Sequence, residues 1–385
     1  PRRLIENLGK LTETILLTAD GKSVMVGLEP EGERTYYSVP ARAFAIVPLD
    51  GSTPLVLEVT GQPLKADEST LYQSAPSTFY LLRDVPGTAQ REVVEVDITS
   101  GRTRRIWSGQ GRFNVVGATP ARDFLVSRFE GLSTTPNYYL FDRSLAIVRR
   151  LSNAEPRLKS VRFGPMESFE TTLPGHDGKL QKVRTYIFLP HGAKRGDRVP
   201  TVVYFYSGSP FSRYAHDFGG GAPNSIPVQI FASRGYGVLF CDVPLGPQGK
   251  GGNPVQEMTD SVLAQVYRSG ELGYSDIHRM AIMGQSYGAY STAAIITATN
   301  IFRAAIALDG MYDLGGMYAR MDRTGGSFGF IWSETGQGRM GTHPWSDLRR
   351  YIANSPYYQA DKIQTPLLLI HGEKDDTCPV EEAQK

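Results

Sequence analysis

Residues 280–290 read Met280-Ala281-Ile282-Met283-Gly284-Gln285-Ser286-Tyr287-Gly288-Ala289-Tyr290. The apolar start of this stretch predicts a buried strand, and the residues after Ser286 predict a helix. Between them stands Gly-x-Ser-x-Gly, the pattern of a sharp strand-to-helix turn that exposes a serine hydroxyl at the edge of a sheet. The start of such a helix directs backbone N–H groups and a positive dipole end toward that edge. Ser286 is therefore the predicted nucleophile, and the N–H of Tyr287 is a predicted oxyanion donor.

From about residue 166 onward, apolar strands alternate with longer helical stretches. The predicted strands are 183–189, 201–206, 237–241, 280–283, 304–308 and 366–370. The predicted helices are 228–233, 259–269, 287–299 and a stretch that begins at Val380. This alternation predicts a doubly wound, mostly parallel sheet that is buried on both faces. With a serine at such a turn, residues 166–385 are predicted to form an α/β-hydrolase catalytic domain.

Residues 1–165 follow a different pattern. Short alternating runs are separated by turn residues, which predicts an all-β region. Asp50, Asp97 and Asp142 each follow an apolar run and precede a turn. They recur at intervals of about 45 residues, which is the period of propeller blades. The first domain, 1–165, is therefore predicted to be a partial β-propeller that is incomplete at its N-terminus, with an antiparallel sandwich as the alternative.

The composition limits the classes of function. The 385 residues include 41 Lys and Arg against 39 Asp and Glu, which gives a net charge of +2. This near-balance argues against a protein that binds nucleic acid or a membrane surface, because either needs a clustered basic field. Cys241 and Cys378 make no disulfide framework, and no apolar run approaches the ~18 residues of a membrane-spanning helix. The chain begins at Pro1 without a leader-like segment, so the compartment stays open between the cytoplasm and the periplasm or secretion.

No cofactor and no metal site is predicted. None of the six histidines stands at metal-ligand spacing with a second pair of ligands. The Gly-x-Gly-x-x-Gly run at 336–341 follows no predicted strand and opens no helix, so it is predicted to be a loop and not a dinucleotide site. The expected partner is a peptide or small-molecule substrate, and a homo-oligomer stays open.

The acid that orients a catalytic histidine follows a later strand in this fold. Residues 366–370 form such a predicted strand and lead into His371-Gly372-Glu373-Lys374-Asp375-Asp376-Thr377-Cys378-Pro379. Asp375 or Asp376 therefore stands at the carboxyl end of the sheet. There it accepts the Nδ1–H of the histidine and fixes its tautomer.

Two segments resemble the prolyl oligopeptidase family of serine peptidases. They read Gly-Gln-Ser-Tyr-Gly-Ala-Tyr at 284–290 and Leu-Ile-His-Gly-x-x-Asp-x-x-x-Pro at 369–379. The resemblance is strong over roughly 185–385 and weak in the N-terminal half. It implies a β-propeller joined to a C-terminal α/β-hydrolase domain. It also implies cleavage of short peptides through an acyl-enzyme on Ser286, as in prolyl oligopeptidases, dipeptidyl peptidases and acylaminoacyl peptidases.

The resemblance also implies the roles of individual residues. By the family spacing, Asp375 is the triad acid and Asp376 is a neighbouring carboxylate. Tyr206, just after an early strand, is the second oxyanion donor, and Tyr204 is the runner-up. The implied substrate pocket is apolar and uses Tyr287, Met311, Tyr312 and Tyr318, with Phe328, Phe330 and Trp332 in the loop that follows.

The catalytic histidine is expected about 30 residues after Asp375. That position lies beyond Lys385, so the hydrolase domain is expected to be incomplete at its C-terminus, and His371 is the alternative base. Cys378 stands where the family commonly has valine, and Asp242–Gly246 replaces an Arg-Gly run, which leaves the specificity open. Two other functions remain: an esterase or amidase of a small metabolite with the same mechanism, and a non-catalytic propeller and hydrolase-like binding protein.

Overall fold

The computed structural model divides the chain into two compact units. It describes residues 11–18, 21–28, 42–59, 62–63, 65–66, 72–75, 77–85, 87–97, 99–176, 178–218, 228–247, 252–322 and 324–385. The described residues up to 161, together with 216–218, form unit 1, and the other described residues from 162 onward form unit 2. In these ranges no helix has the length and apolar character needed to cross a bilayer.

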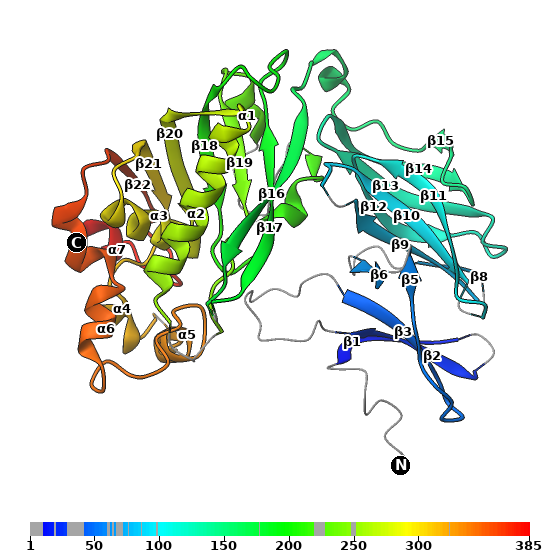
Figure 1. Cartoon of the computed structure of the whole chain (residues 1–385), viewed down its shortest axis with the longest axis horizontal. Helices are drawn as coiled ribbons and strands as arrows, with labels where there is room; N and C mark the ends of the chain where they lie inside the picture. Colours follow the sequence, from blue (N-terminus) through cyan, green and yellow to red (C-terminus); the bar gives the residue numbers. More distant parts are fainter. Residues whose placement is uncertain are drawn as a thin grey trace. The chain divides into compact units, whose positions relative to one another are not determined.

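Unit 1 is built from antiparallel β-sheets (Figure 1). The first main sheet contains β1 (Leu11–Leu17), β2 (Ser23–Leu28), β3 (Arg42–Pro48) and β4 (Leu55–Val56), with β7 (Lys65–Ala66) paired to β3; β5 (Glu58–Val59) and β6 (Gln62–Pro63) form a small separate ladder. The second contains β8 (Tyr72–Ala75), β9 (Thr78–Asp84), β10 (Arg91–Asp97) and β11 (Arg102–Gly109). The third contains β12 (Arg112–Ala118), β13 (Phe124–Gly131), β14 (Thr134–Asp142) and β15 (Ile147–Arg150).

The repeated aspartates mark the same place in each main sheet. Asp50 follows β3, and Asp97 and Asp142 end β10 and β14, which are each the third strand of their sheet. In every case one carboxylate oxygen accepts the backbone N–H two residues later at 2.8 Å, from Ser52, Thr99 and Ser144 respectively. This is the local turn that aspartate favours after a strand, so the sequence repeat has a structural cause.

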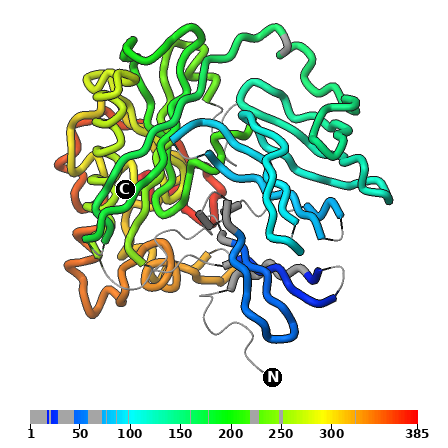
Figure 2. The backbone as a smooth tube through the Cα atoms, turned by 45° about the vertical axis from the view of Figure 1, so that its right-hand side comes forward, coloured from blue at the N-terminus to red at the C-terminus, as the bar shows by residue number. Residues whose placement is uncertain are grey.

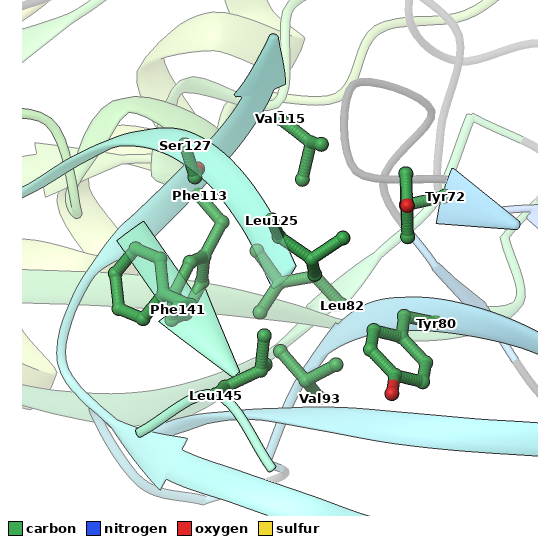
Figure 3. A pocket seen from close by; sticks show the side chains of 10 residues that line it. All are labelled: Tyr72, Tyr80, Leu82, Val93, Phe113, Val115, Leu125, Ser127, Phe141 and Leu145. Carbon is green, nitrogen blue, oxygen red and sulfur yellow. The ribbon is translucent and has the colours of Figure 1, made fainter. Parts of the chain in front are cut away.

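The side chains of β9 and β10 alternate between the two faces of the second sheet, and each face packs against a neighbouring sheet. The core cluster between the first and second sheets comprises Met25, Phe44, Ile46, Leu57, Phe79, Leu81, Val94 and Val96. The second set of core side chains lies between the second and third sheets and comprises Tyr80, Leu82, Val93, Phe113, Leu125, Tyr139, Phe141 and Leu145. The side chains of this second set other than Tyr139, together with Tyr72, Val115 and Ser127, line a cavity of about 20 Å³ (Figure 3). That volume suits about one water molecule, so this interface is packed and is not a ligand site.

Unit 2 contains one mixed seven-stranded sheet, and the course of its chain can be followed by colour in Figure 2. Its strands lie in the order β16 (Met166–Pro174), β17 (Leu180–Phe188), β19 (Gly237–Cys241), β18 (Val199–Phe205), β20 (Ser275–Gln285), β21 (Phe302–Leu308) and β22 (Leu367–Ile370). The pairings β16–β17 and β17–β19 are antiparallel, and the remaining four are parallel. Every residue of β19 is buried, as expected for a strand covered on both faces.

Strand β16 was absent from the sequence prediction because its pattern is weak. It alternates buried with more exposed positions and is rich in Glu, Ser and Thr, unlike the apolar central strands.

The helices of unit 2 are α1 (Val228–Ala232), α2 (Pro254–Glu271), α3 (Tyr287–Ala298), α4 (Leu314–Tyr318), α5 (Gly329–Glu334), α6 (Leu348–Ala353) and α7 (Glu381–Gln384). Short 3₁₀ turns are η2 (Pro156–Ser160) in unit 1, and η3 (Phe211–Tyr214) and η5 (Pro356–Lys362) in unit 2.

The parallel strands bring distant segments to one edge of this sheet. Tyr204 of β18 pairs with Met283 of β20, Gln285 of β20 pairs with Leu308 of β21, and Leu308 pairs with Ile370 of β22. The chain therefore leaves all four strands at the same carboxyl edge, where open α/β sheets place their ligands.

Candidate active site

Ser286 occupies the turn between β20 and α3. Its backbone has φ 56° and ψ −119°, a region that non-glycine residues rarely adopt and that costs about 1–3 kcal/mol. The surrounding chain holds it there, because its N–H donates to Leu308 O at 2.8 Å and its carbonyl accepts from Ala289 N at 2.9 Å. Ser286 itself is half-buried. The strained backbone thus presents the hydroxyl at the carboxyl edge of the sheet.

The two glycines beside Ser286 are required by close backbone approaches. A Cβ atom at Gly284 would lie 2.3 Å from Gly288 O, and one at Gly288 would lie 2.7 Å from Phe205 O. Both distances are shorter than real Cβ contacts, and both involve backbone atoms that have little freedom to move. The Gly-x-Ser-x-Gly pattern therefore has a steric reason: β20, α3 and the end of β18 meet here without room for side chains.

Tyr206 follows β18 directly and lies next to the nucleophile turn. It is half-buried, and its ring centroid lies 6.2 Å from that of Tyr287. Tyr204, in contrast, is buried within β18 and packs edge-on against Phe211 and Phe240. Of the two tyrosines weighed from the sequence, Tyr206 is the one that stands at the carboxyl edge of the sheet.

The loop after β22 carries the predicted acid. Asp375 is half-buried, and its Oδ1 accepts from Thr377 N at 2.9 Å and from Cys378 N at 2.8 Å. Asp376 is exposed, and its carbonyl accepts from Arg320 Nη1. Two backbone donors thus fix the orientation of the Asp375 carboxylate, whereas the Asp376 side chain faces solvent.

Cys378 links this loop to Ser286. Its thiol is buried, and burial together with the nearby Asp375 charge raises its pKa to about 12, opposed by a hydrogen bond with the Ser286 side chain. Cys378 stands where the resembling family commonly has valine, and the structure sets its side chain beside the Ser286 hydroxyl. At neutral pH this cysteine is therefore an uncharged thiol with little nucleophilic character.

His371, the alternative base, is engaged within its own loop. Its Nε2 lies 2.6 Å from Cys378 O, which fixes Nε2 as the protonated nitrogen. To serve as a base for Ser286 through Nε2, His371 would have to leave this carbonyl. The geometry favours a structural role in the loop.

Comparison with known proteins places these segments in a family. Residues 225–385 match the prolyl oligopeptidase family. This part of the chain is a prolyl oligopeptidase family domain.

Relatives extend the similarity beyond that domain. Dipeptidyl aminopeptidase BIII of Pseudoxanthomonas mexicana is 26% identical over 386 residues, which cover 94% of this chain and 52% of the relative. The chain thus spans about half the length of that relative. Among solved structures, a puromycin-hydrolyzing peptidase of Mycobacterium tuberculosis has a TM-score of 0.61 at 19% identity, covering 96% of this chain and 55% of the other. An acylaminoacyl peptidase of Pyrococcus horikoshii has a TM-score of 0.58 at 19% identity, covering 95% and 54%.

Within the prolyl oligopeptidase family domain, the predicted pocket residues separate into different clusters. Tyr287 is fully buried, stacks on Tyr290 with ring centroids 5.1 Å apart, and contacts Trp332 edge-on at 5.9 Å. Met311 packs with Met317 and Cys378, and the partly buried Phe328 and Trp332 lie against this cluster. These two groups share Trp332, so they form one apolar region beside Ser286.

Three other aromatic residues of the predicted pocket have further neighbours in this domain. Tyr312 packs with Ala289, Ala293 and Ala307, below α3. Tyr318 packs edge-on against Trp345 and Tyr351, and its hydroxyl donates to the Glu334 carboxylate. Phe330 is 44% exposed. Tyr318 also packs against the core cluster that contains Tyr287.

Arg339 was missed from the sequence. It is 1% exposed, and its Nε and Nη1 donate to Gly246 O at 2.8 Å and to Gln337 O at 3.1 Å. A Cβ atom at Gly208 would lie 2.8 Å from Nη2, so the guanidinium packs directly against the turn that follows Tyr206. Burial raises the pKa of Tyr287 to about 12, and the Arg339 charge opposes that rise.

Arg339 therefore braces the turn after Tyr206 and lies beside the ring of Tyr287. The only sequence signal was the glycine-rich run at 336–341, which was interpreted as a loop. That interpretation gave no reason for a buried arginine, because the burial depends on contacts with Gly208 and Gly246, which are far away in the chain. The backbone N–H of Gly246 donates a hydrogen bond to Glu257 Oε2 at 2.6 Å.

Proposed function

We propose that this chain carries the nucleophile, the acid and the oxyanion donors of a serine peptidase that cleaves short peptides through an acyl-enzyme on Ser286. The observation that carries the proposal is the strained Ser286 turn at the carboxyl edge of the sheet, with Tyr206 and the Asp375 loop beside it. The family match of residues 225–385 supports the reaction class.

The proposed chemistry assigns one role to each of these groups. The Ser286 Oγ attacks the scissile carbonyl, and a histidine that follows Asp375 in the sequence takes its proton. The Tyr206 hydroxyl and the Tyr287 N–H, which has no acceptor within the first turn of α3, donate to the oxyanion. The histidine then protonates the leaving amine, and water releases the acyl group. Asp375 accepts the Nδ1–H of the histidine.

The same proposal includes the finer architecture. The three main antiparallel sheets of unit 1 are blades of a β-propeller, and unit 2 is an α/β-hydrolase domain. The blade interpretation is supported by the repeated aspartate after each third strand. The hydrolase interpretation is supported by the strand order and by the serine turn after β20.

Substrate preference follows from the apolar region beside Ser286. The side chains of Met311, Trp332 and Cys378 offer no charge to a substrate residue, so an apolar residue or proline is expected before the scissile bond. The name dipeptidyl aminopeptidase borne by the relative from P. mexicana makes dipeptide release the first activity to measure.

A substrate panel tests this proposal. The full-length protein is assayed with dipeptidyl p-nitroanilides that end in proline, alanine or glutamate, next to p-nitrophenyl acetate and butyrate. We expect amide hydrolysis, with the proline and alanine substrates faster than the glutamate one. Hydrolysis of the esters alone would identify an esterase, and no turnover on any substrate would favour the non-catalytic alternative.

The oxyanion role of Tyr206 predicts a selective loss. Tyr206→Phe removes a donor that acts only in the transition state, so kcat is expected to fall by about 10²–10³ while KM stays nearly constant. Tyr204→Phe is the matched control, since it removes the same hydroxyl two residues earlier inside β18 and is expected to leave kcat almost unchanged. Steady-state kinetics on the best substrate measure both. Equal losses in the two variants, or a change confined to KM, would show that Tyr206 only packs.

A further inference from the structure

Three side chains with metal-binding atoms converge at the carboxyl edge of the sheet. Asp309 directly follows β21, and His371 and Asp375 follow the neighbouring strand β22. One nitrogen or oxygen atom of each lies within 4.8 Å of the other two, and all three residues are half-buried. They meet because Leu308 and Ile370, the last residues of the two strands, are paired.

Hydrogen bonds with backbone groups orient each of these side chains. Asp309 Oδ1 accepts from Gly372 N at 3.2 Å, and Asp375 Oδ1 accepts from two backbone N–H groups. His371 uses Nε2 on Cys378 O, which leaves Nδ1 with the lone pair. Nδ1 is buried and has no hydrogen-bond partner among the described residues. Metal-binding histidines and carboxylates are commonly held in this way by their second oxygen or nitrogen atom.

The charge of the cluster calls for a cation. In the part of the chain that the structure describes, neither Asp309 nor Asp375 forms an ion pair with a lysine or arginine. Two carboxylates this close repel one another unless a positive charge lies between them. The Nδ1 of His371, which has no hydrogen-bond partner among the described residues, offers such a cation a nitrogen ligand beside the two carboxylates.

We propose that Asp309, His371 and Asp375 bind one Zn²⁺ ion, with water as the fourth ligand. One nitrogen and two carboxylate oxygens are ligands that Zn²⁺ accepts, at about 2.0–2.2 Å. A tetrahedral site with such bonds has ligand atoms roughly 3.4 Å apart, so small side-chain rotations close the observed cluster onto the ion. The other histidines and cysteines of the chain lie outside this group.

The consequence for activity rests on the proposed function. In that proposal Asp375 is the acid that accepts a hydrogen bond from the catalytic histidine. Zn²⁺ bound to a carboxylate oxygen of Asp375 prevents this carboxylate from accepting that bond. Zinc is therefore a reversible inhibitor, which a chelator removes.

Metal binding is tested first, and without reference to activity. The protein is stripped with EDTA, dialysed and titrated with Zn²⁺ by isothermal calorimetry, next to His371→Asn, Asp309→Asn and the control Asp376→Asn. We expect one ion per chain for the unmodified protein and for Asp376→Asn, and at least a tenfold weaker affinity for the other two variants. Thermal unfolding by circular dichroism confirms that each variant is folded. Absence of binding to the unmodified protein, or equal affinity in all four, overturns the site.

Inhibition is tested on the same four proteins. Hydrolysis of the best dipeptidyl p-nitroanilide is followed with and without Zn²⁺, each rate being divided by the rate of the same variant in EDTA. Zinc is expected to inhibit the unmodified protein and Asp376→Asn, with recovery in EDTA, and to inhibit His371→Asn and Asp309→Asn at least tenfold less strongly. Binding without inhibition of an active protein refutes the inhibitory role. Binding in a protein that hydrolyses nothing keeps the site and refutes the proposed function.

Discussion

A fluorophosphonate probe is expected to label the protein at Ser286 alone, and Ser286→Ala is expected to abolish the labelling. The hydroxyl stands on a turn with φ 56° that the surrounding hydrogen bonds hold in place, so it is presented for attack before substrate arrives. Loss of a serine nucleophile lowers kcat by about 10⁴–10⁶, because no other group forms the acyl-enzyme. In-gel fluorescence and steady-state kinetics measure the two effects.

A matched control separates nucleophilicity from folding. Ser291 lies on α3, and its hydroxyl donates to Tyr287 O at 2.6 Å. Ser291→Ala therefore changes a buried serine in the helix that follows Ser286. Labelling is expected to persist in this variant. If Ser286→Ala remained labelled, or if the probe were found on another residue by mass spectrometry, the assignment of the nucleophile would be wrong.

Asp375→Asn is expected to lower kcat roughly 10⁴-fold, the cost of losing the acid that fixes the histidine tautomer. The amide keeps the shape of the side chain, and its oxygen still accepts from Thr377 and Cys378 N–H, so the loop is expected to keep its fold. Only the negative charge and the acceptor for the histidine are lost.

The neighbouring residue provides the control for this experiment. Asp376→Asn removes the same charge from an exposed side chain and is expected to leave kcat within a few-fold of the original. Stopped-time assays of both variants at pH 7 compare the two losses. A larger effect from Asp376 than from Asp375 would reverse the assignment that the family spacing suggested.

The local sequence was sufficient wherever the structural requirement was local. The Gly-x-Ser-x-Gly turn was predicted because the steric conflict at Gly284 involves Gly288, only four positions away along the chain. The repeated aspartates behave in the same way, since each one bonds a backbone N–H two residues later. Such contacts form in any fold that continues the strand into a turn.

The contacts of the pocket residues depended on the packing of α3 and the loops around it. Tyr287 and Met311 both lie against Trp332, and Tyr318 packs against the same core cluster as Tyr287, whereas Tyr312 packs with alanines of α3 and β21. A tyrosine in a sequence carries no mark of which of these neighbours its ring will meet. The buried position of Arg339 has the same origin, since it depends on a loop returning beneath Gly208 and Gly246.

By itself, the sequence determined the serine turn, the strand-and-helix alternation around it and the Asp375 loop after residue 370. Only the tertiary structure decided that Asp309 would meet His371 and Asp375. The first follows β21 and the other two follow β22, and long stretches of helix and loop separate them in the chain. They become neighbours because β21 and β22 pair in parallel, which aligns the carboxyl ends of strands whose order in the sheet no local pattern encodes.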